Sequence, residues 1–329
     1  MPMKPNEITS LISKFQESRI FLTAAEMDVF TLLAKNPMSA KEIGNQLKAT
    51  VRGITILLDA IVSMGLLEKK EEKYHCPAEV ASILSKESPT SIMPMVMLAT
   101  GGWKRWSNLT DIVRHGKETT RPTALDINES EQEVFSGAMH AVAYRMAPGI
   151  VAAIKPGNAK KLLDIGGGSG AYTQAFLEAS PGLTATIFDL PPAINIAQKR
   201  LATTGLLNRI QLVAGDFYKD ELPTGHDLAL LSAIIHQNSP EQNSELYQKI
   251  LRALQPEGRL VIRDHVMSSD HTQPASGAFF AVNMLVVTAG GNTYSFEEIK
   301  SSLESAGFIK VNLIQPDERM NGLVEGFKP

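Results

Sequence analysis

The chain has 329 residues, of which 43% are hydrophobic, and it carries a formal net charge of -3 at pH 7. This length allows two domains, the hydrophobic content is that of a globular protein, and the small charge gives no overall reason to expect nucleic acid or a membrane as partner. The single cysteine, Cys76, excludes an internal disulfide framework and fits a reducing, cytoplasmic location. The first residues lack the apolar core of a signal peptide, and no apolar run approaches the roughly 18 residues that span a bilayer.

Residues 1–100 are expected to form a mainly α-helical winged-helix domain. Ser39 and Glu42 have the spacing of a capping box, and the apolar helix 54–64 leads into two short strands. A winged helix can read DNA with its second helix, but helix 54–64 carries Asp59, which would repel phosphates. Because a helix that is apolar nearly all round is normally buried, we expect it to pack against a second subunit, with DNA binding as the alternative.

Residues 101–155 are predicted to be a helical linker punctuated by prolines. Four of its large side chains could pack between domains or line a pocket for a small molecule: Trp103, Phe135, Met139 and Tyr144. Methionine and aromatic side chains fill irregular apolar space in either case, so both interpretations stay open.

Strands and helices alternate through residues 156–329. The expected strands cover residues 162–165, 184–188, 210–215, 227–235, 259–263, 308–314 and 323–327. Alternation of this kind builds a parallel sheet with helices on both faces. The last two strands have a short connection, so we expect them to be antiparallel.

An acid closes each of the first three strands in this region. Asp164 precedes a glycine-rich turn, Asp189 ends the second strand and Asp216 follows the third. Gly166 and Gly168 satisfy, with the alanine after Gly170, the G-x-G-x-x-G/A pattern of NAD-binding proteins. Because open α/β sheets bind ligands beyond the carboxyl ends of their strands, these residues predict a nucleotide site.

The series Asp164-x-Gly, Asp189-Leu190-Pro-Pro and Asp216-Phe217 resembles the class I S-adenosylmethionine (SAM) methyltransferases. Its Asp-Leu-Pro element is similar to the small-molecule O-methyltransferase branch, which includes plant phenolic and acetylserotonin enzymes. The resemblance implies a Rossmann-like methyltransferase sheet, with SAM as cofactor and S-adenosylhomocysteine (SAH) as product. It also implies a homodimer formed through the winged-helix domain, and a small hydroxylated, aromatic acceptor.

The resemblance assigns these residues to the cofactor site: Asp164, Gly166, Gly168, Asp189, Leu190, Asp216, Phe217 and Ser232. Asp189 would accept both ribose hydroxyls, since an ionised carboxylate has the acceptor sites to do so. Asp216 would bond the adenine amino group, although it could instead cap the next helix. Asp164 suits a loop organiser better than a ligand contact, and Ser232 stands where plant members often have lysine.

Methyl transfer to a phenol benefits from a base, because little of a group with a pKa of about 10 is ionised at neutral pH. His236 follows the fourth strand and resembles the general base in the His-Asp-Trp-Ser-Asp-Glu segment of plant enzymes. Gln237, Asn238 and Pro240 depart from that segment, which weakens inference about the substrate. A helix-capping or core histidine is the structural alternative.

Asp264 ends the fifth strand and resembles the acid that supports this histidine by fixing its tautomer. His265 is a rival base. Because neighbours on a strand point to opposite faces, only one of Asp264 and His265 should face the pocket.

Residues 266–293 form a long insert with a helix expected at 274–288, which covers the acceptor in the resembling enzymes. The residues expected to bind the acceptor are Phe135, Met139, Phe280, Asn283 and Met284. Asn283 could bond an acceptor hydroxyl or serve as a packing amide. The remaining histidines and Cys76 show no metal-ligand spacing, so we expect no metal.

Together these features predict a homodimeric, SAM-dependent O-methyltransferase. Three alternatives stay open. An NAD-dependent oxidoreductase would use the same glycines, and a DNA-binding regulator would use the winged helix. A SAM-binding fold could also methylate carbon or nitrogen, or catalyse a reaction other than methylation.

Overall fold

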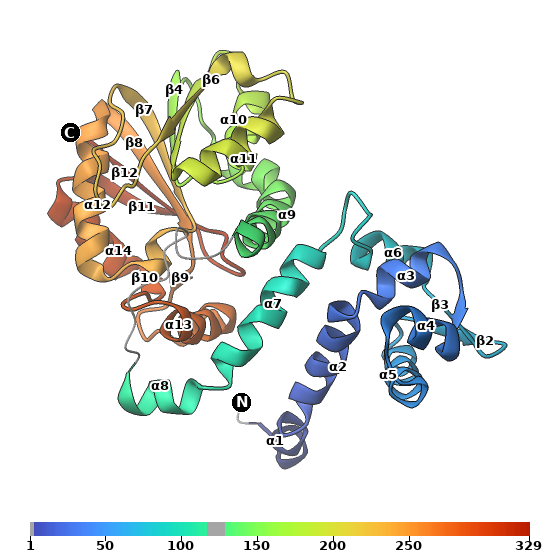
Figure 1. The fold of residues 1–329 in the computed structure, drawn as a ribbon. Coiled ribbons are helices and arrows are strands. Elements are labelled where there is room, and N and C mark those ends of the chain that lie inside the picture. Colours follow the sequence, from blue (N-terminus) through green and yellow to red (C-terminus); the bar gives the residue numbers. More distant parts are fainter. Residues whose placement is uncertain (1–2, 117–128) are drawn as a thin grey trace. The chain divides into compact units, whose positions relative to one another are not determined.

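The computed structural model describes residues 3–116 and 129–329, except for the side chains of residues 129–135 and 138. The chain forms two compact units (Figure 1). The small unit comprises residues 1–104 and 130–141, and the large unit comprises residues 105–129 and 142–329. Within the described ranges, none of the helices is long and apolar enough to cross a membrane.

The small unit has the helices and the wing that the sequence predicts. Its helices are α1 (Pro5–Leu11), α2 (Lys14–Glu26), α3 (Val29–Lys35), α4 (Ala40–Leu47), α5 (Val51–Ser63), α6 (Ala78–Leu84) and most of α7 (Met93–Trp106). Strands β1 (Met38–Ser39), β3 (Lys73–His75) and β2 (Glu68–Lys70) lie side by side in that order and are antiparallel. The capping box is present: Ser39 Oγ accepts the Glu42 N–H, and the Glu42 carboxylate accepts the Ser39 N–H.

Helix α5 is apolar on two sides, and only one of them is covered within the chain. Ile54, Leu58 and Ile61 are buried in the core of the small unit, whereas Val51 and Ile56 are 47% and 56% exposed. The helix is therefore less buried in the single chain than its composition predicts, and an apolar face stays open.

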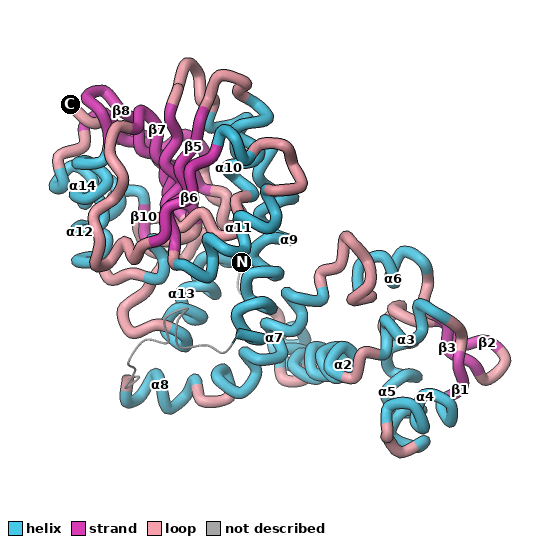
Figure 2. Tube along the Cα trace, turned by 45° about the horizontal axis from the view of Figure 1, so that its top comes forward, coloured by secondary structure: helices cyan, strands magenta, loops and turns pink. Residues whose placement is uncertain are grey.

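The large unit is built on a sheet whose strands lie in the order β11-β12-β8-β7-β4-β5-β6. Figure 2 shows the strands of this sheet in magenta with helices in cyan around them. The strands are β4 (Lys161–Ile165), β5 (Thr184–Asp189), β6 (Ile210–Ala214), β7 (His226–Ser232), β8 (Leu254–Asp264), β11 (Ile309–Gln315) and β12 (Gly322–Phe327). Strands β4 to β8 pair in parallel, and β12 is antiparallel to both of its neighbours. The predicted Rossmann-like sheet with an antiparallel C-terminal strand is confirmed.

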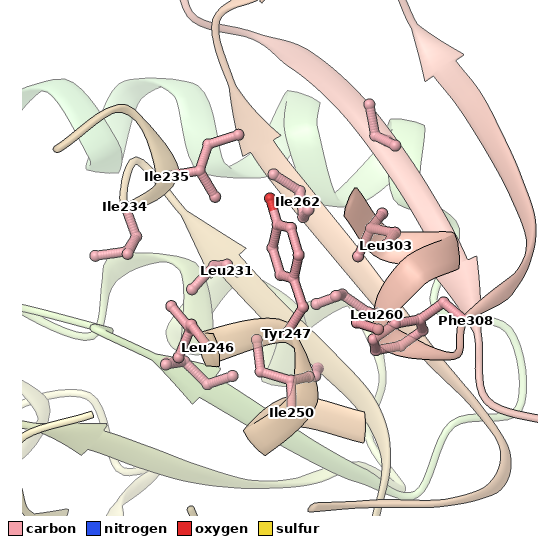
Figure 3. Packing of buried hydrophobic residues seen from close by; sticks show 14 of the residues in the cluster. Leu231, Ile234, Ile235, Leu246, Tyr247, Ile250, Leu260, Ile262, Leu303 and Phe308 are labelled. Atoms are coloured by element: carbon pink, nitrogen blue, oxygen red, sulfur yellow. The ribbon is translucent and has the colours of Figure 1, made fainter. Parts of the chain in front are cut away.

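Helices cover both faces of this sheet. They are the second half of α9 (Glu129–Ile154), α10 (Ala171–Ala179), α11 (Pro191–Leu201), α12 (Pro240–Ala253) and α14 (Phe296–Ala306). Helix α13 (Ala275–Val287) instead contacts α8 (Leu109–His115) and the 3-10 turn η2 (Ile235–Gln237), and a second such turn, η1 (Leu207–Arg209), precedes β6. On one face, strand residues such as Leu231 and Ile262 pack with α12 and α14 around the buried Tyr247 (Figure 3). On the other face, Leu230 and Val261 pack with α9 and α10. Because successive side chains of a strand point to opposite faces of the sheet, neighbouring strand residues pack against different helix layers.

Two local predictions are corrected, and one short strand is added. The strand expected to reach Ile235 ends at Ser232, because Ala233 adopts a left-handed backbone with φ of 57°. Helix α9 continues through Pro148, one of the prolines that were expected to punctuate the linker. The long insert also contains strand β9 (Val266–Met267), which pairs in parallel with β10 (Tyr294–Ser295).

Candidate active site

The glycine-rich loop is fastened to Asp189 at the end of β5. Asp189 Oδ2 accepts the Gly168 N–H at 2.7 Å, and its Oδ1 accepts the Leu190 N–H at 2.7 Å. Gly166 and Gly168 have φ of 68° and 56°, a conformation that side chains disfavour. A Cβ placed on Gly168 would meet no described atom within 4 Å. The loop therefore leaves open space directly above the residue that bonds Asp189.

Asp164 lies under the loop. It is 1% exposed, its Oδ2 accepts a 2.6 Å hydrogen bond from Thr173 Oγ1, and a Cβ on Gly167 would lie 2.9 Å from its carboxyl carbon. Burial raises the pKa of Asp164 to about 6, against the opposing effect of the Thr173 hydroxyl. This geometry suits an organiser of the loop.

Asp216 is engaged in a turn rather than at a helix start. Its Oδ1 accepts the Tyr218 N–H at 3.0 Å, and its Oδ2 lies 3.3 Å from Lys219 Nζ. The neighbouring Phe217 reaches the glycine-rich loop, since its ring lies 3.7 Å from the position of a Cβ on Gly166. Phe217 thus lies beside the loop.

His236 is carried by η2, just after the left-handed Ala233. The turn is held by two buried amides: Asn243 Nδ2 donates to the Ile235 carbonyl at 3.0 Å, and Asn238 Nδ2 donates to Asn243 Oδ1 at 2.9 Å. Asn238, which departs from the plant motif, is thus a structural residue that fixes the turn below the imidazole.

Asp264 faces His236, as expected for a supporting acid. His236 Nδ1 lies 2.8 Å from Asp264 Oδ1 and 2.9 Å from Oδ2, and the Asp264 side chain is 1% exposed. Burial alone would raise the pKa of Asp264, but His236, the His265 N–H and Arg263 together lower it. An ionised carboxylate only accepts hydrogen bonds, so Nδ1 carries the proton and Nε2 keeps its lone pair.

The rival histidine, His265, faces a different acid. Its Nδ1 lies 2.6 Å from Asp317 Oδ2, and both side chains are buried. Phe280 of α13 contacts both imidazoles, with ring centroids 4.9 Å from His236 and 5.0 Å from His265. The structure therefore brings two histidine–carboxylate pairs to one aromatic ring.

Three of the other residues predicted to bind the acceptor have described side chains. Asn283 Oδ1 accepts a 3.2 Å hydrogen bond from Trp106 Nε1, so its amide oxygen already has a protein donor. Met284 is 4% exposed, in the interior of the large unit. Met139 belongs to the small unit and is 40% exposed. Phe135 lies outside the described side chains.

Sequence reasoning missed Asp317, Asn243 and Trp106 as parts of this neighbourhood. Asp317 stands 52 residues from His265, and Trp106 stands 177 residues from Asn283. The one local signal was the short distance along the chain from His236 to Asn243. Across residues 3–116 and 129–329, no group of three His, Cys, Asp or Glu residues is arranged to hold a metal ion.

Comparison with known proteins gives matches over nearly the whole chain. A family model described as the O-methyltransferase domain matches residues 106–309, and one described as the O-methyltransferase dimerisation domain matches residues 9–87. The chain is 30% identical over 330 residues to 3-hydroxy-5-methyl-1-naphthoate 3-O-methyltransferase of Streptomyces sahachiroi, covering 98% of this chain and 95% of that protein. It is 29% identical to acetylserotonin O-methyltransferase of Gallus gallus, covering 94% and 93%. The solved structure of PigF with SAH has a TM-score of 0.87 at 25% identity, covering 99% and 100% of the two chains.

Proposed function

Because the chain belongs to the O-methyltransferase family and is a SAM-dependent enzyme, we propose that it methylates a phenolic hydroxyl of a small aromatic molecule, with His236 as the general base. Because the chain belongs to this family, there is no longer a reason to favour an NAD-dependent oxidoreductase. The family also gives the N-terminal region a dimerisation domain in place of a DNA-binding role.

The geometry of His236 carries the proposal. Asp264 holds Nδ1–H and leaves Nε2 as the acceptor for a phenol proton, in a side chain that is 12% exposed. As that proton arrives, the buried carboxylate stabilises the imidazolium that forms. Phe280 packs its ring against the imidazole and helps to exclude water from it. General-base assistance of this kind contributes roughly 10²- to 10⁴-fold to a rate.

The residues around the glycine-rich loop fit SAM on two observations. The space above Gly168 is open, and each Asp189 oxygen accepts one backbone N–H and keeps a further acceptor site for a ribose hydroxyl. Leu190 and Phe217 would contact the adenosine, and Asp216 is proposed for the adenine amino group. When bound, SAM supplies an electrophilic methyl group, and the chain orients the acceptor and holds its proton at His236.

The acceptor class is inferred from the relatives. Several of them are named for aromatic substrates, such as a hydroxynaphthoate and acetylserotonin. We propose a homodimer in which the open face of α5 contributes to the interface. We retain residues 1–100, 101–155 and 156–329 as the dimerisation, linker and catalytic regions, with Phe135, Met139, Asn283 and Met284 as proposed acceptor contacts.

Exchange of His236 tests the base. His236→Gln should lower kcat with a phenolic acceptor by about 10²- to 10⁴-fold and leave the affinity for SAH unchanged. His271→Gln is the matched control, because His271 is a half-exposed histidine paired with Glu298. Methyl transfer by His236→Gln at a near wild-type rate would eliminate the base assignment.

A further inference from the structure

Tyr218 connects the segment proposed to contact adenine with the turn that carries His236. It follows Asp216 and Phe217 directly, and its hydroxyl donates a hydrogen bond to Oδ1 of Asn238, 20 residues further along the chain. Asn238 is fully buried and lies two residues after His236. Tyr218 therefore bonds, from the side of the cofactor segment, a residue that fixes the position of the proposed base.

The hydrogen bonds beyond Asn238 have only one possible direction. The carbonyl of Ile235 can only accept, so the side chain of Asn243 donates to it through Nδ2 and keeps Oδ1 as an acceptor. Asn238 Nδ2 donates to this Oδ1 at 2.9 Å, which leaves Asn238 Oδ1 to accept the hydroxyl of Tyr218. Loss of the Tyr218 hydroxyl would therefore take a donor from a buried amide oxygen, a change that costs free energy.

The segment that carries Tyr218 is held independently of this hydroxyl. Lys249 of α12 donates through Nζ to the carbonyls of Phe217 and Asp220, at 2.9 and 2.8 Å. The Tyr218 ring also packs against that of Phe217, with centroids 4.5 Å apart. Loss of the hydroxyl should therefore disturb the His236 turn and leave the contacts proposed for adenosine in place.

The same two segments meet at the glycine-rich loop. A Cβ on Gly166 would lie 2.6 Å from Ile234 Cδ1 and 3.7 Å from Phe217 Cε1. Ile234 precedes His236 by two residues. The position of the turn therefore sets the distance from His236 to a cofactor bound over this loop.

We propose that Tyr218 is a positioning residue for methyl transfer, which acts through Asn238 on the orientation of His236 and so rests on the proposed role of His236 as the base. In Tyr218→Phe, kcat with a phenolic acceptor should fall by about threefold to thirtyfold, because a small misplacement of a reacting group has a large effect on the rate. The affinity for SAH, measured by calorimetry, should stay within about twofold of the wild-type value.

A double-mutant cycle separates positioning of the base from a general structural effect. If Tyr218 acts through His236, adding Tyr218→Phe to His236→Gln should change kcat by less than about twofold, because the group that Tyr218 positions is already gone. An equal loss of kcat in the wild-type and His236→Gln backgrounds would overturn the proposal, as would an unchanged kcat in Tyr218→Phe alone. A near wild-type rate in His236→Gln alone would instead refute the base, and this proposal with it.

Tyr74→Phe is the matched control. Tyr74 belongs to the small unit and also donates its hydroxyl to a side-chain oxygen, Asp59 Oδ1, at 2.8 Å. Its kcat should stay near that of the wild type, and equal losses in Tyr74→Phe and Tyr218→Phe would contradict a specific role for Tyr218. Tyr218 is half-buried and the exchange removes a single oxygen atom, so Tyr218→Phe should fold, which urea denaturation of both variants checks.

Discussion

The ring of Phe280 stands edge-on to the imidazole of His236, with centroids 4.9 Å apart and an interplanar angle of 90°. The same ring contacts His265, which Asp317 holds from the loop between β11 and β12. A second bond ties this loop to α13, since Ser276 Oγ donates to the Glu318 carbonyl at 2.8 Å. The position of Phe280 next to the proposed base therefore depends on a loop far from it in sequence.

Phe280→Ala should lower kcat/KM for the acceptor by roughly threefold to tenfold, because an aromatic contact contributes about 0.5–1.5 kcal/mol beyond its burial. The affinity for SAH should not change, since Asp189 and its loop are untouched. Phe279→Ala is the matched control, because this neighbour is 71% exposed. Steady-state kinetics that showed equal losses in both variants would contradict a specific role for Phe280.

Asp264→Asn should reduce kcat by about 10²- to 10⁴-fold. An asparagine can donate its amide N–H to Nδ1, which moves the imidazole proton to Nε2 and removes the acceptor that the phenol needs. Nitrogen NMR chemical shifts of the imidazole would report the tautomer directly, and kinetics would report its effect. Asp317→Asn should leave the tautomer of His236 as it is, and a wild-type rate in Asp264→Asn would refute the support role.

The stability of the folded protein should depend on pH through the titration of Asp164. Its pKa in the folded protein is about 6, above the value of about 4 in an unfolded chain, so the folded state binds the proton more tightly. The contribution of Asp164 to stability is therefore fully present below about pH 4 and is lost as the pH rises through about 6.

Asp164→Asn removes this titration. The free energy of unfolding of the wild type minus that of Asp164→Asn, measured by urea denaturation without ligand, should fall by about 2 kcal/mol between pH 4 and pH 7. Titrating groups that do not interact with Asp164 cancel in this difference. A difference that stays constant over the range would show that Asp164 is not an acid of raised pKa.

Gly168→Ala should distinguish the loss of space for the ligand from the cost of a strained backbone. Gly168 and Gly205 both have positive φ, and a Cβ on either would meet no described atom within 4 Å. Each alanine should therefore cost a similar ~1–2 kcal/mol of stability through its left-handed conformation. Only Gly168→Ala should also weaken SAH binding by more than about tenfold, as calorimetry would show. Equal SAH affinities in the two variants would place the ligand elsewhere.

The helices and strands of the large unit could be predicted because the sequence patterns that specify them are local. Strand β5 (Thr184–Asp189) lies where the strand at 184–188 was predicted, because its apolar run ends at Asp189 before Pro191 and Pro192. The end of β7 could not be predicted, because the left-handed Ala233 and the bond from Asn243 to the Ile235 carbonyl are tertiary features. The expectation that only one of two neighbours would face the pocket assumed a regular strand, but β8 ends at Asp264 and His265 lies at an irregular junction.

The position of β12 between β8 and β11 has a consequence for synthesis of the chain. Strand β8, which carries Asp264, remains an open sheet edge until residues 322–327 have left the ribosome and can pair with it. The helices and strands before it can assemble first, since their contacts are with segments already made. The acid proposed to orient the base is therefore enclosed only after residues 322–327 have emerged, and nascent chains stalled before residue 322 should expose an unpaired strand edge to chaperones.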